Sequence, residues 1–378
     1  MIKVGITGQA GFVGTHLYNT LGLNPGKYSR VPFEDSFFSD NQKLQDFVSG
    51  CDVVVHLAAM NRHHDPEIIY NTNISLVKKL IDACEITHSR PHILFSSSTQ
   101  EDKDNMYGRS KKEGRQLIEK WALSTSSNFT GLIIPNVFGP FGHPYYNSVV
   151  ATFCHQLTHN ETPKIDIDGE LKLIYVGELV SEILKKIDKK NADLNKSFVE
   201  NYSISHTSTI KVSDLLQKLR SFKDNYFEKG TLPDLSNSFE RNLYNTFLTY
   251  IDHKSFFPFL LKLNTDDRGT FVETIKLNSG GQVSFSTTKP GITRGNHFHT
   301  RKAERFAVIK GKAIIEMRRI GTKEKFIFEL DGSKPSFVDM PVWFTHNITN
   351  VGADEVYTIF WISEHFDQAD PDTFFELV

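Results

Sequence analysis

Four side chains in the last third of the chain have the types and spacing of a metal site. His297 and His299 are two residues apart in TRGNHFHT, so on a β-strand both imidazoles leave the same face. Glu304 follows after a short turn, and His346 lies further along in PVWFTHNITN. Three nitrogens and one carboxylate oxygen suit zinc or another borderline divalent ion. Ordinary strand residues are the alternative, but the combined spacing of all four favours one zinc-like ion.

A second group, in the first third of the chain, has the types needed for proton transfer to a carbonyl. In YGRSK, Tyr107 and Lys111 are four residues apart, so on a helix they share a face. A nearby ammonium stabilises a phenolate, which helps a phenol whose ordinary pKa is about 10 to exchange a proton. We predict that Tyr107 is the general acid and that Ser98 orients the reacting oxygen. A solvated helix face is the alternative, and the preceding strand that ends in serines favours catalysis.

The N-terminus must position the cofactor that supplies a hydride. The first apolar run leads directly into TGQAGFVG, and a helical pattern follows. Strand, glycine turn and helix are the context in which glycines let the backbone approach a pyrophosphate at the helix N-terminus. The predicted cofactor contacts here are Gly8, Gly11, Phe12, Val13 and Gly14.

The next strand, expected at residues 28–31, indicates which cofactor is used. An acidic residue at its end favours NAD, whereas a basic residue favours the 2′-phosphate of NADP. Arg30 occupies this region, although Glu34 and Asp35 lie close by. We therefore expect NADPH, held in part by Arg30.

Two more apolar strands continue the pattern. DVVVHLAA ends in small residues against which a cofactor can lie, and HILFSSS ends at Ser98. Strands that alternate with helical segments predict a doubly wound parallel sheet with ligands at the carboxyl ends of its strands. Further cofactor contacts are expected at Leu57, Ala58 and Ala59, as well as at Tyr107 and Lys111.

Length and composition limit the alternatives. The chain has 378 residues, enough for two or three domains, and a net charge of −2, which gives no basic surface for nucleic acid or an acidic membrane. The three cysteines are widely spaced, which favours reduced thiols. We see neither a signal-peptide pattern nor a long apolar span, so we expect a cytoplasmic protein that does not contact a membrane.

The motifs TGQAGFVG, HLAA, FSSS, YGRSK and PNVFGP together resemble the extended short-chain dehydrogenase/reductase family. The resemblance covers about residues 1–245 and implies an NADP-binding reductase domain that acts on a nucleotide-activated sugar, with Asn136 near the substrate. Ile133 departs from the pattern, because relatives often have Arg two residues before the Pro of PNVFG. Dehydratases and 4-epimerases of this family, which hold NAD tightly, remain an alternative.

From residue 264 onward, short alternating runs predict an all-β structure, so residues 246–378 are assigned to a second domain with an N-terminal arm. Its metal pattern resembles the cupin superfamily of β-barrels. DDRGTFVE and ITRGNHF also resemble a cupin 3,5-epimerase of nucleotide 4-keto-6-deoxy sugars, which implies substrate contacts at Arg268 and Arg294. In that epimerase the histidine matching His297 is the catalytic base. A metal-bound imidazole cannot serve as a free base, so we assign His297 as a ligand.

A reductase domain fused to a metal cupin resembles a family of bifunctional enzymes of bacterial capsule and O-antigen synthesis. The resemblance implies a homodimer in which the cupin epimerises C3 of UDP-2-acetamido-2,6-dideoxy-4-hexulose. The reductase domain would then reduce C4 with NADPH to the L-talose sugar, on the route to UDP-N-acetyl-L-fucosamine. The rival hypothesis is a plain NADPH-dependent reductase whose cupin is a structural or dimerisation module, because closed four-ligand zinc sites are usually structural.

Overall fold

The structure is a computed structural model that describes residues 1–189, 197–267, 269–278 and 280–378. The chain forms two compact units, which we describe separately. The sheet unit comprises Met1–Phe138, Gly142–Val149 and Glu170–Ile210. The barrel unit comprises Gly139–Phe141, Val150–Gly169 and Lys211–Val378.

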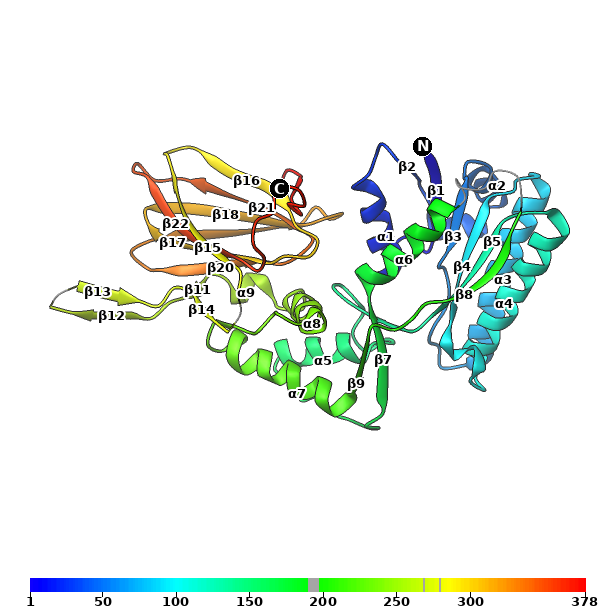
Figure 1. The fold of residues 1–378 in the computed structure, drawn as a ribbon, viewed down its shortest axis with the longest axis horizontal. Coiled ribbons are helices and arrows are strands. Elements are labelled where there is room, and N and C mark those ends of the chain that lie inside the picture. Colours follow the sequence, from blue (N-terminus) through cyan, green and yellow to red (C-terminus); the bar gives the residue numbers. More distant parts are fainter. Residues whose placement is uncertain (190–196, 268, 279) are drawn as a thin grey trace. The chain divides into compact units, whose positions relative to one another are not determined.

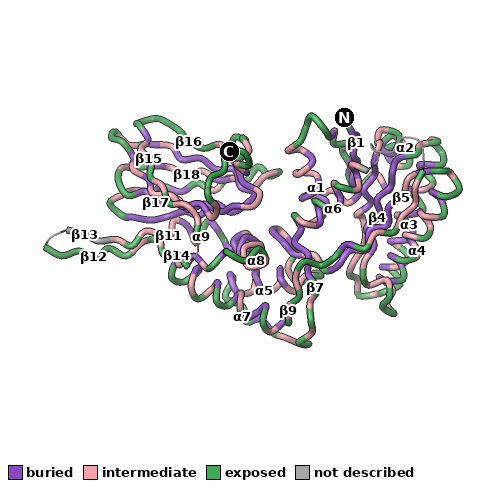
Figure 2. Tube along the Cα trace, viewed as in Figure 1, coloured by how far each residue is buried: buried purple, intermediate pink, exposed green. Residues whose placement is uncertain are grey.

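The sheet unit is built on six parallel strands in the order β2-β1-β3-β4-β5-β8. The central strands are almost entirely buried, as their continuous apolar runs predict for a parallel sheet covered on both faces (Figure 2). The strands are β1 (Ile2–Thr7), β2 (Tyr28–Val31), β3 (Val53–His56), β4 (His92–Ser98), β5 (Phe129–Ile134) and β8 (Val199–Ser203).

Helices cover both faces of this sheet (Figure 1). One core lies between the sheet and α1 with α6, and the other lies between the sheet and α2, α3 and α4. A small sheet of β6 (Asn136–Phe138), β7 (Glu170–Tyr175) and β9 (Ser208–Lys211) extends the unit. The helices are α1 (Phe12–Gly22), η1 (Asp35–Ser39), α2 (Asn41–Ser49), α3 (Pro66–Ile86), η2 (Thr99–Asp102), α4 (Met106–Thr125) and α6 (Val176–Lys189).

This arrangement confirms the predicted doubly wound parallel sheet. The strand order reverses direction at β1, because β2 lies on one side of it and β3 on the other. In such sheets a ligand binds in the crevice at the carboxyl ends of the strands, next to the reversal point. The glycine turn after β1 lies at that point.

The barrel unit contains two five-stranded sheets, β11-β20-β17-β22-β15 and β19-β18-β21-β16-β23, whose strand pairs are antiparallel. A shared core fills the space between them, as expected for a cupin barrel. The strands are β11 (Phe259–Leu260), β15 (Gln282–Thr288), β16 (Thr293–Phe298), β17 (Glu304–Lys310), β18 (Lys312–Arg319), β19 (Lys325–Asp331), β20 (Ser336–Met340), β21 (Phe344–Asn350), β22 (Val356–Ile362) and β23 (Phe374–Phe375).

The helices of the barrel unit begin well before the expected domain boundary. We predicted domains of 1–245 and 246–378, but the segment from Lys211 onward belongs to the barrel's compact unit. Tyr226 donates a hydrogen bond of 2.6 Å to Asp339, which pairs with the buried Arg305 at 2.7 Å. These contacts tie the helical segment to β17 and β20. The helices are α5 (Val149–Thr158), α7 (Val212–Phe222), η3 (Lys223–Phe227), α8 (Ser238–Leu248) and α9 (His253–Phe256).

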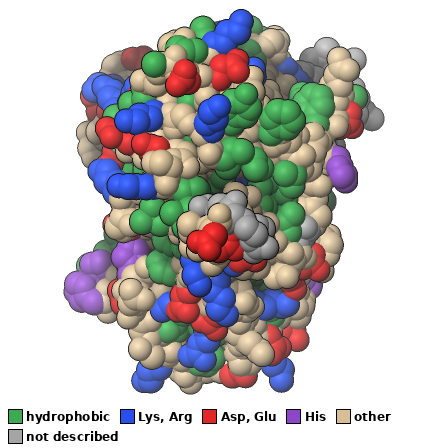
Figure 3. Space-filling view, turned by 90° about the vertical axis from the view of Figure 1, so that its left-hand side faces the viewer, with side chains coloured by type: hydrophobic (Ala, Val, Ile, Leu, Met, Phe, Trp, Pro, Cys, Tyr) green, Lys and Arg blue, Asp and Glu red, His purple; other side chains and the backbone are tan. Residues whose placement is uncertain are grey.

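A two-stranded hairpin, β12 (Leu263–Asp266) with β13 (Gly269–Val272), projects from the barrel unit (Figure 1). Beside its base, β10 (Thr231–Leu232) pairs with β14 (Lys276–Leu277). Figure 3 shows hydrophobic side chains exposed among charged ones on this side of the unit, in keeping with the high exposure of residues such as Leu260 and Phe285. In the described part of the chain we find no helix long and apolar enough to cross a bilayer.

Candidate functional site

The glycine turn between β1 and α1 has the close backbone contacts that a dinucleotide cradle requires. Gly8 has φ +71°, and a Cβ there would lie 2.8 Å from the backbone nitrogen of Ala58. A Cβ on Gly14 would lie 2.2 Å from the carbonyl oxygen of Gly8. Gly11 donates to that same carbonyl at 3.0 Å. The turn is therefore folded tightly against the segment that follows β3.

The start of α1 and the end of β3 complete this cradle. Thr15 makes a helical backbone bond to Gly11, which leaves Phe12 and Val13 in the first turn, at the positive end of the helix. Leu57 donates its backbone N–H to the carbonyl of Thr7 at 3.1 Å. Residues 57–59 thus begin directly beside the carboxyl end of β1, where they can line a cofactor.

Arg30 does not lie where the 2′-phosphate prediction requires it. In the β1–β2 register it is opposite Val4, three residues before the carboxyl end of β1 at Thr7. Its guanidinium lies 4.4 Å from the centre of the Tyr18 ring, and a Cβ on Gly22 would meet it at 2.7 Å. Arg30 therefore packs on the later turns of α1 and away from the glycine turn. The position of its guanidinium does not support the expected contact with the 2′-phosphate of NADPH.

The proposed catalytic residues lie at the end of β4 and in α4, as predicted. Ser98 ends β4, and its hydroxyl accepts from the backbone N–H of Gln100 at 3.2 Å. Tyr107 and Lys111 share a face of α4, with the ammonium 5.8 Å from the centre of the phenol ring. The ammonium donates to the carbonyl of Ser96 at 2.8 Å. Lys111 is thus fixed to β4 beside Tyr107.

The protonation of this pair differs from the expectation. Burial and the neighbouring Tyr146 raise the pKa of Tyr107 to about 12, where we had expected the cation to lower it. Burial lowers the pKa of Lys111 to about 8, although Glu101 opposes this shift. Tyr107 is therefore firmly protonated near neutral pH, which suits a proton donor, and Lys111 is the group that titrates in the working range.

Three contacts that hold α4 in place were not predicted from the sequence. A Cβ on Gly108 would lie 2.1 Å from the carbonyl oxygen of Gln100, so this glycine lets α4 approach the η2 turn after Ser98. The guanidinium of Arg115 donates two hydrogen bonds, of 2.8 and 2.7 Å, to the carboxylate of Glu101 in η2. Asn73 of α3 donates to Ser110 of α4 at 2.9 Å. The signal for Gly108 was visible in YGRSK, whereas the other contacts depend on the fold.

The three predicted substrate residues have different outcomes. Asn136 begins β6 and is exposed, and Arg268 lies outside the described residues. Arg294 is exposed on β16, opposite Ile348. A bulge after Gly295, where Asn296 has φ +57°, shifts the register so that Arg294 shares the inward face of the metal cluster.

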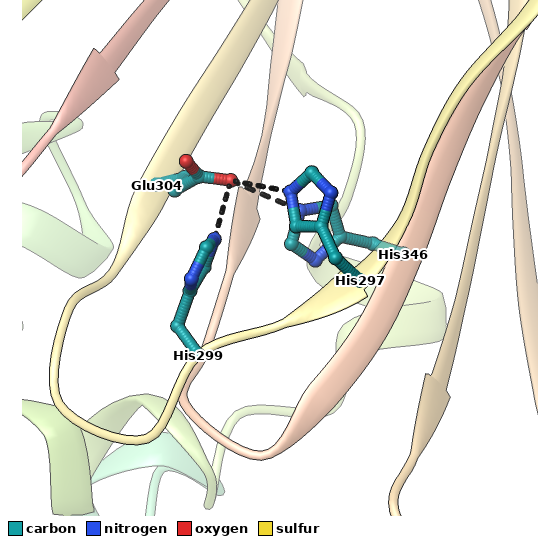
Figure 4. Close-up of side chains that lie close together, drawn as sticks. All are labelled: His297, His299, Glu304 and His346. Carbon is teal, nitrogen blue, oxygen red and sulfur yellow. Dashed lines mark hydrogen bonds and ion pairs between the residues drawn. The ribbon is translucent and has the colours of Figure 1, made fainter. Parts of the chain in front are cut away.

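The four predicted ligands meet inside the barrel (Figure 4). The cluster is drawn from β17, β21 and the β16 region, and one ligand atom from each residue lies within 4.8 Å of the others. The Nε2 atoms of His346, His299 and His297 lie 2.9, 3.1 and 3.8 Å from one carboxylate oxygen of Glu304.

The hydrogen bonds of the rings are compatible with a cation held among the ligand atoms. In His346, Nδ1 faces the carbonyl of Phe344 at 3.1 Å while Nε2 faces Glu304. In His299, Nδ1 faces the carbonyl of Asp372 at 2.6 Å while Nε2 faces the same carboxylate. A neutral imidazole has one N–H, and donating it to the carbonyl leaves a lone pair aimed at the carboxylate. A divalent ion between these atoms would satisfy both, so the residues fit a metal.

Electrostatics agrees with this donor set. Burial alone would raise the pKa of Glu304, but the close approach of the three imidazoles to its carboxylate holds that pKa well below the ordinary value. Burial lowers the pKa of His346 against the opposing effect of Glu304. An ionised carboxylate and neutral imidazoles are the forms that bind metal ions.

Comparisons with known proteins define the class. Residues 4–200 match the NAD dependent epimerase/dehydratase family, and residues 264–374 match the polysaccharide biosynthesis C-terminal domain. The chain belongs to the NAD dependent epimerase/dehydratase family.

Particular relatives match over the whole length. UDP-2-acetamido-2,6-beta-L-arabino-hexul-4-ose reductase of Pseudomonas aeruginosa is 34% identical, with 99% of this chain and 98% of the relative covered. Among solved structures, the capsular polysaccharide assembling protein CapF of Staphylococcus aureus is 34% identical, with a TM-score of 0.62 and 100% of both chains covered. A Pseudomonas aeruginosa protein, RMD, solved with NADPH, is 20% identical with a TM-score of 0.52 over 59% of this chain and 84% of its own, which shows the shared fold.

Proposed function

We propose that this chain is a bifunctional nucleotide-sugar enzyme. Its barrel unit epimerises C3 of UDP-2-acetamido-2,6-dideoxy-4-hexulose, and its sheet unit then reduces C4 with NADPH to UDP-2-acetamido-2,6-dideoxy-L-talose. The product lies on the route to UDP-N-acetyl-L-fucosamine for capsule or O-antigen. Both relatives are similar over the full chain. The Pseudomonas aeruginosa reductase supports the substrate class by its name, and CapF supports a role in capsule synthesis.

The reduction step uses the residues at the end of β4 and in α4. A nicotinamide cofactor bound in the glycine cradle would supply the hydride for C4 of the sugar. Tyr107 is placed to give its phenolic proton to the ketone oxygen. Lys111, next to the ring, stabilises the phenolate left behind. Ser98 orients and polarises the ketone oxygen.

The epimerisation step is driven by the same ketone. A 4-keto group makes the C3 proton acidic, so the proton can leave and return on the other face. A divalent ion held by His297, His299, Glu304 and His346 would stabilise the negative charge that develops on the sugar. Arg294, on the inward face of β16, is placed to bind an anionic part of the substrate.

The observation that carries the second activity is the convergence of His297, His299 and His346 on Glu304. The test is to incubate the full chain with the 4-keto sugar in D₂O without NADPH. We expect deuterium at C3 by NMR, and with NADPH added we expect the reduced L-talose product. Absence of C3 exchange in metal-loaded protein would overturn the epimerase assignment.

The second candidate is a plain reductase whose barrel is a structural or dimerisation module. The observation that favours it is the burial of three of the four ligands, because closed sites are usually structural. The side chain of His297 is 26% exposed, which favours a site that a substrate can reach. Reduction of the sugar without any C3 exchange would support this candidate.

The choice of NADPH needs its own measurement. Because Arg30 stacks on Tyr18, we expect Arg30→Ala to change kcat/KM for NADPH and NADH by the same factor. A selective loss with NADPH would restore the contact predicted from the sequence. The wild-type ratio of the two kcat/KM values decides the cofactor.

We further propose that the enzyme is a cytoplasmic homodimer, as its family resemblance implies. Light scattering on the purified chain, which gives the molar mass in solution, should return twice the chain mass of 43.1 kDa. A value equal to one chain mass would contradict the dimer.

A further inference from the structure

The C-terminal segment Asp370–Val378 lies against the loop that separates the metal ligands. Strand β23 pairs with β16, so that Phe375 is opposite His297 and Phe374 is opposite Phe298. The segment thus adds a short strand to the sheet next to β16, the strand that carries His297. It also reaches the following loop, Thr300–Lys302, which leads to Glu304.

One carboxylate of this segment anchors that loop. Asp372 is 4% exposed, and its side chain accepts from the backbone N–H groups of Thr300 at 3.1 Å, Arg301 at 3.0 Å and Lys302 at 3.3 Å. The hydroxyl of Thr300 donates to it as well, at 2.6 Å. Successive N–H groups around one anion form a rigid nest. The nest fixes the loop between the ligands of β16 and the ligand of β17.

The backbone of the same residue contacts a ligand directly. The carbonyl oxygen of Asp372 lies 2.6 Å from Nδ1 of His299. This bond places the proton on Nδ1 and leaves the Nε2 lone pair facing Glu304. Asp372 has φ +42°, a backbone conformation that Asp, Asn and Gly adopt more readily than other residues. The side-chain nest holds the residue in this conformation and so holds the carbonyl in place.

The geometry points to Asp372 as the positioning residue of the metal site, a role that rests on the metal binding proposed above. Its carboxylate fixes the ligand loop, and its carbonyl sets the tautomer and the orientation of His299. The last residues of the chain therefore complete a site whose ligands all lie between residues 297 and 346.

The test measures zinc affinity of the metal-stripped full chain by competition with a chromophoric chelator. Asp372→Gly removes the carboxylate and keeps the positive φ accessible, and Asp372→Asn keeps the shape but removes the charge. We expect each to weaken zinc binding about 10- to 100-fold, the usual effect of losing a group that orients a ligand. The matched control is Asp370→Asn, which removes an exposed partner of Arg301 in the same segment and should leave the affinity unchanged.

Two further readouts separate positioning from folding. Metal-free Asp372→Asn should still unfold in a cooperative transition, although the loss of hydrogen bonds to the loop lowers its Tm. The visible spectrum of its cobalt form should shift because a ligand is reoriented. Zinc affinity and cobalt spectra equal to the wild type in both Asp372 variants would overturn the role. If the wild type itself binds no zinc, the metal proposal fails, which is a different outcome.

Discussion

At the residue scale, Tyr107 is the group whose loss separates the two proposed activities. Tyr107→Phe removes the proton donor and keeps the ring that packs beside Lys111. We expect reduction to fall by about 10² to 10⁴, the usual contribution of a positioned general acid. Exchange at C3 should continue at the wild-type rate, because the four-ligand cluster lies in the other compact unit. NADPH oxidation and deuterium exchange, measured on the same preparation, provide the check.

Lys111 sets the expected pH dependence of reduction. Its pKa is lowered by burial to about 8, so the ammonium is present below that pH and is lost as the pH rises through it. The phenol of Tyr107, with a pKa of about 12, stays protonated throughout this range. We therefore expect kcat for reduction to decline above about pH 8. The Lys111→Arg variant keeps its charge at these pH values, so its residual activity should show no such decline. A wild-type rate that stays flat to pH 10 would contradict the role of the Lys111 ammonium.

At the scale of elements, Gly108 controls how α4 meets the η2 turn. A Cβ at this position would lie 2.1 Å from the carbonyl oxygen of Gln100, a distance that requires the backbone to move. We expect Gly108→Ala to destabilise the chain by about 1–3 kcal/mol, as overpacking does, and to lower reduction because Tyr107 is displaced. Gly26→Ala is the control, since nothing lies within 4 Å of a Cβ there. Thermal unfolding and NADPH oxidation test both variants, and equal results for the two would refute the packing argument.

Elements with strong local signals could be predicted from the sequence. The strand at residues 28–31 and the glycine turn depend on short-range patterns, and the structure has them where expected. The spacing of His297, His299, Glu304 and His346 predicted that these side chains meet, and they form one cluster, whereas their binding of a metal stays a prediction. Arg30 was misplaced because the strand register, which no local pattern reveals, sets it opposite Val4. The inward direction of Arg294 depends in the same way on a bulge. Asp372 was missed because it contacts His299 across 73 residues.

The boundary between the units shows a similar limit. Periodicity can indicate a helix such as α7, but it does not reveal the surface on which that helix packs. The contacts of Tyr226 with Asp339 assign this region to the barrel. A boundary at residue 245 follows chain order, whereas the compact units follow contacts between distant residues.

For the whole molecule, the metal should stabilise one unit and leave the other's chemistry intact. We expect His299→Ala to abolish stoichiometric zinc, to lower the Tm of the barrel unit and to stop C3 exchange. NADPH reduction of a sugar already epimerised should persist, because Ser98, Tyr107 and Lys111 have their own core. Elemental analysis, calorimetry and product NMR test these three statements.

Contradiction would come from a simple result. If protein purified without chelator holds no stoichiometric metal and still has full epimerase activity, the four residues are not a metal site. His297 would then become the candidate catalytic base, as the resemblance of ITRGNHF to the 3,5-epimerase motif implies.

The interleaving of the two compact units limits how a gene for this protein can be divided. Gly139–Phe141 and Val150–Gly169 belong to the barrel unit although the surrounding chain belongs to the sheet unit. A single break at residue 210 would leave α5 with the wrong partner, and a shorter gene for either half would encode an incomplete core. Recombination that cuts once therefore leaves at least one of the two compact units incomplete.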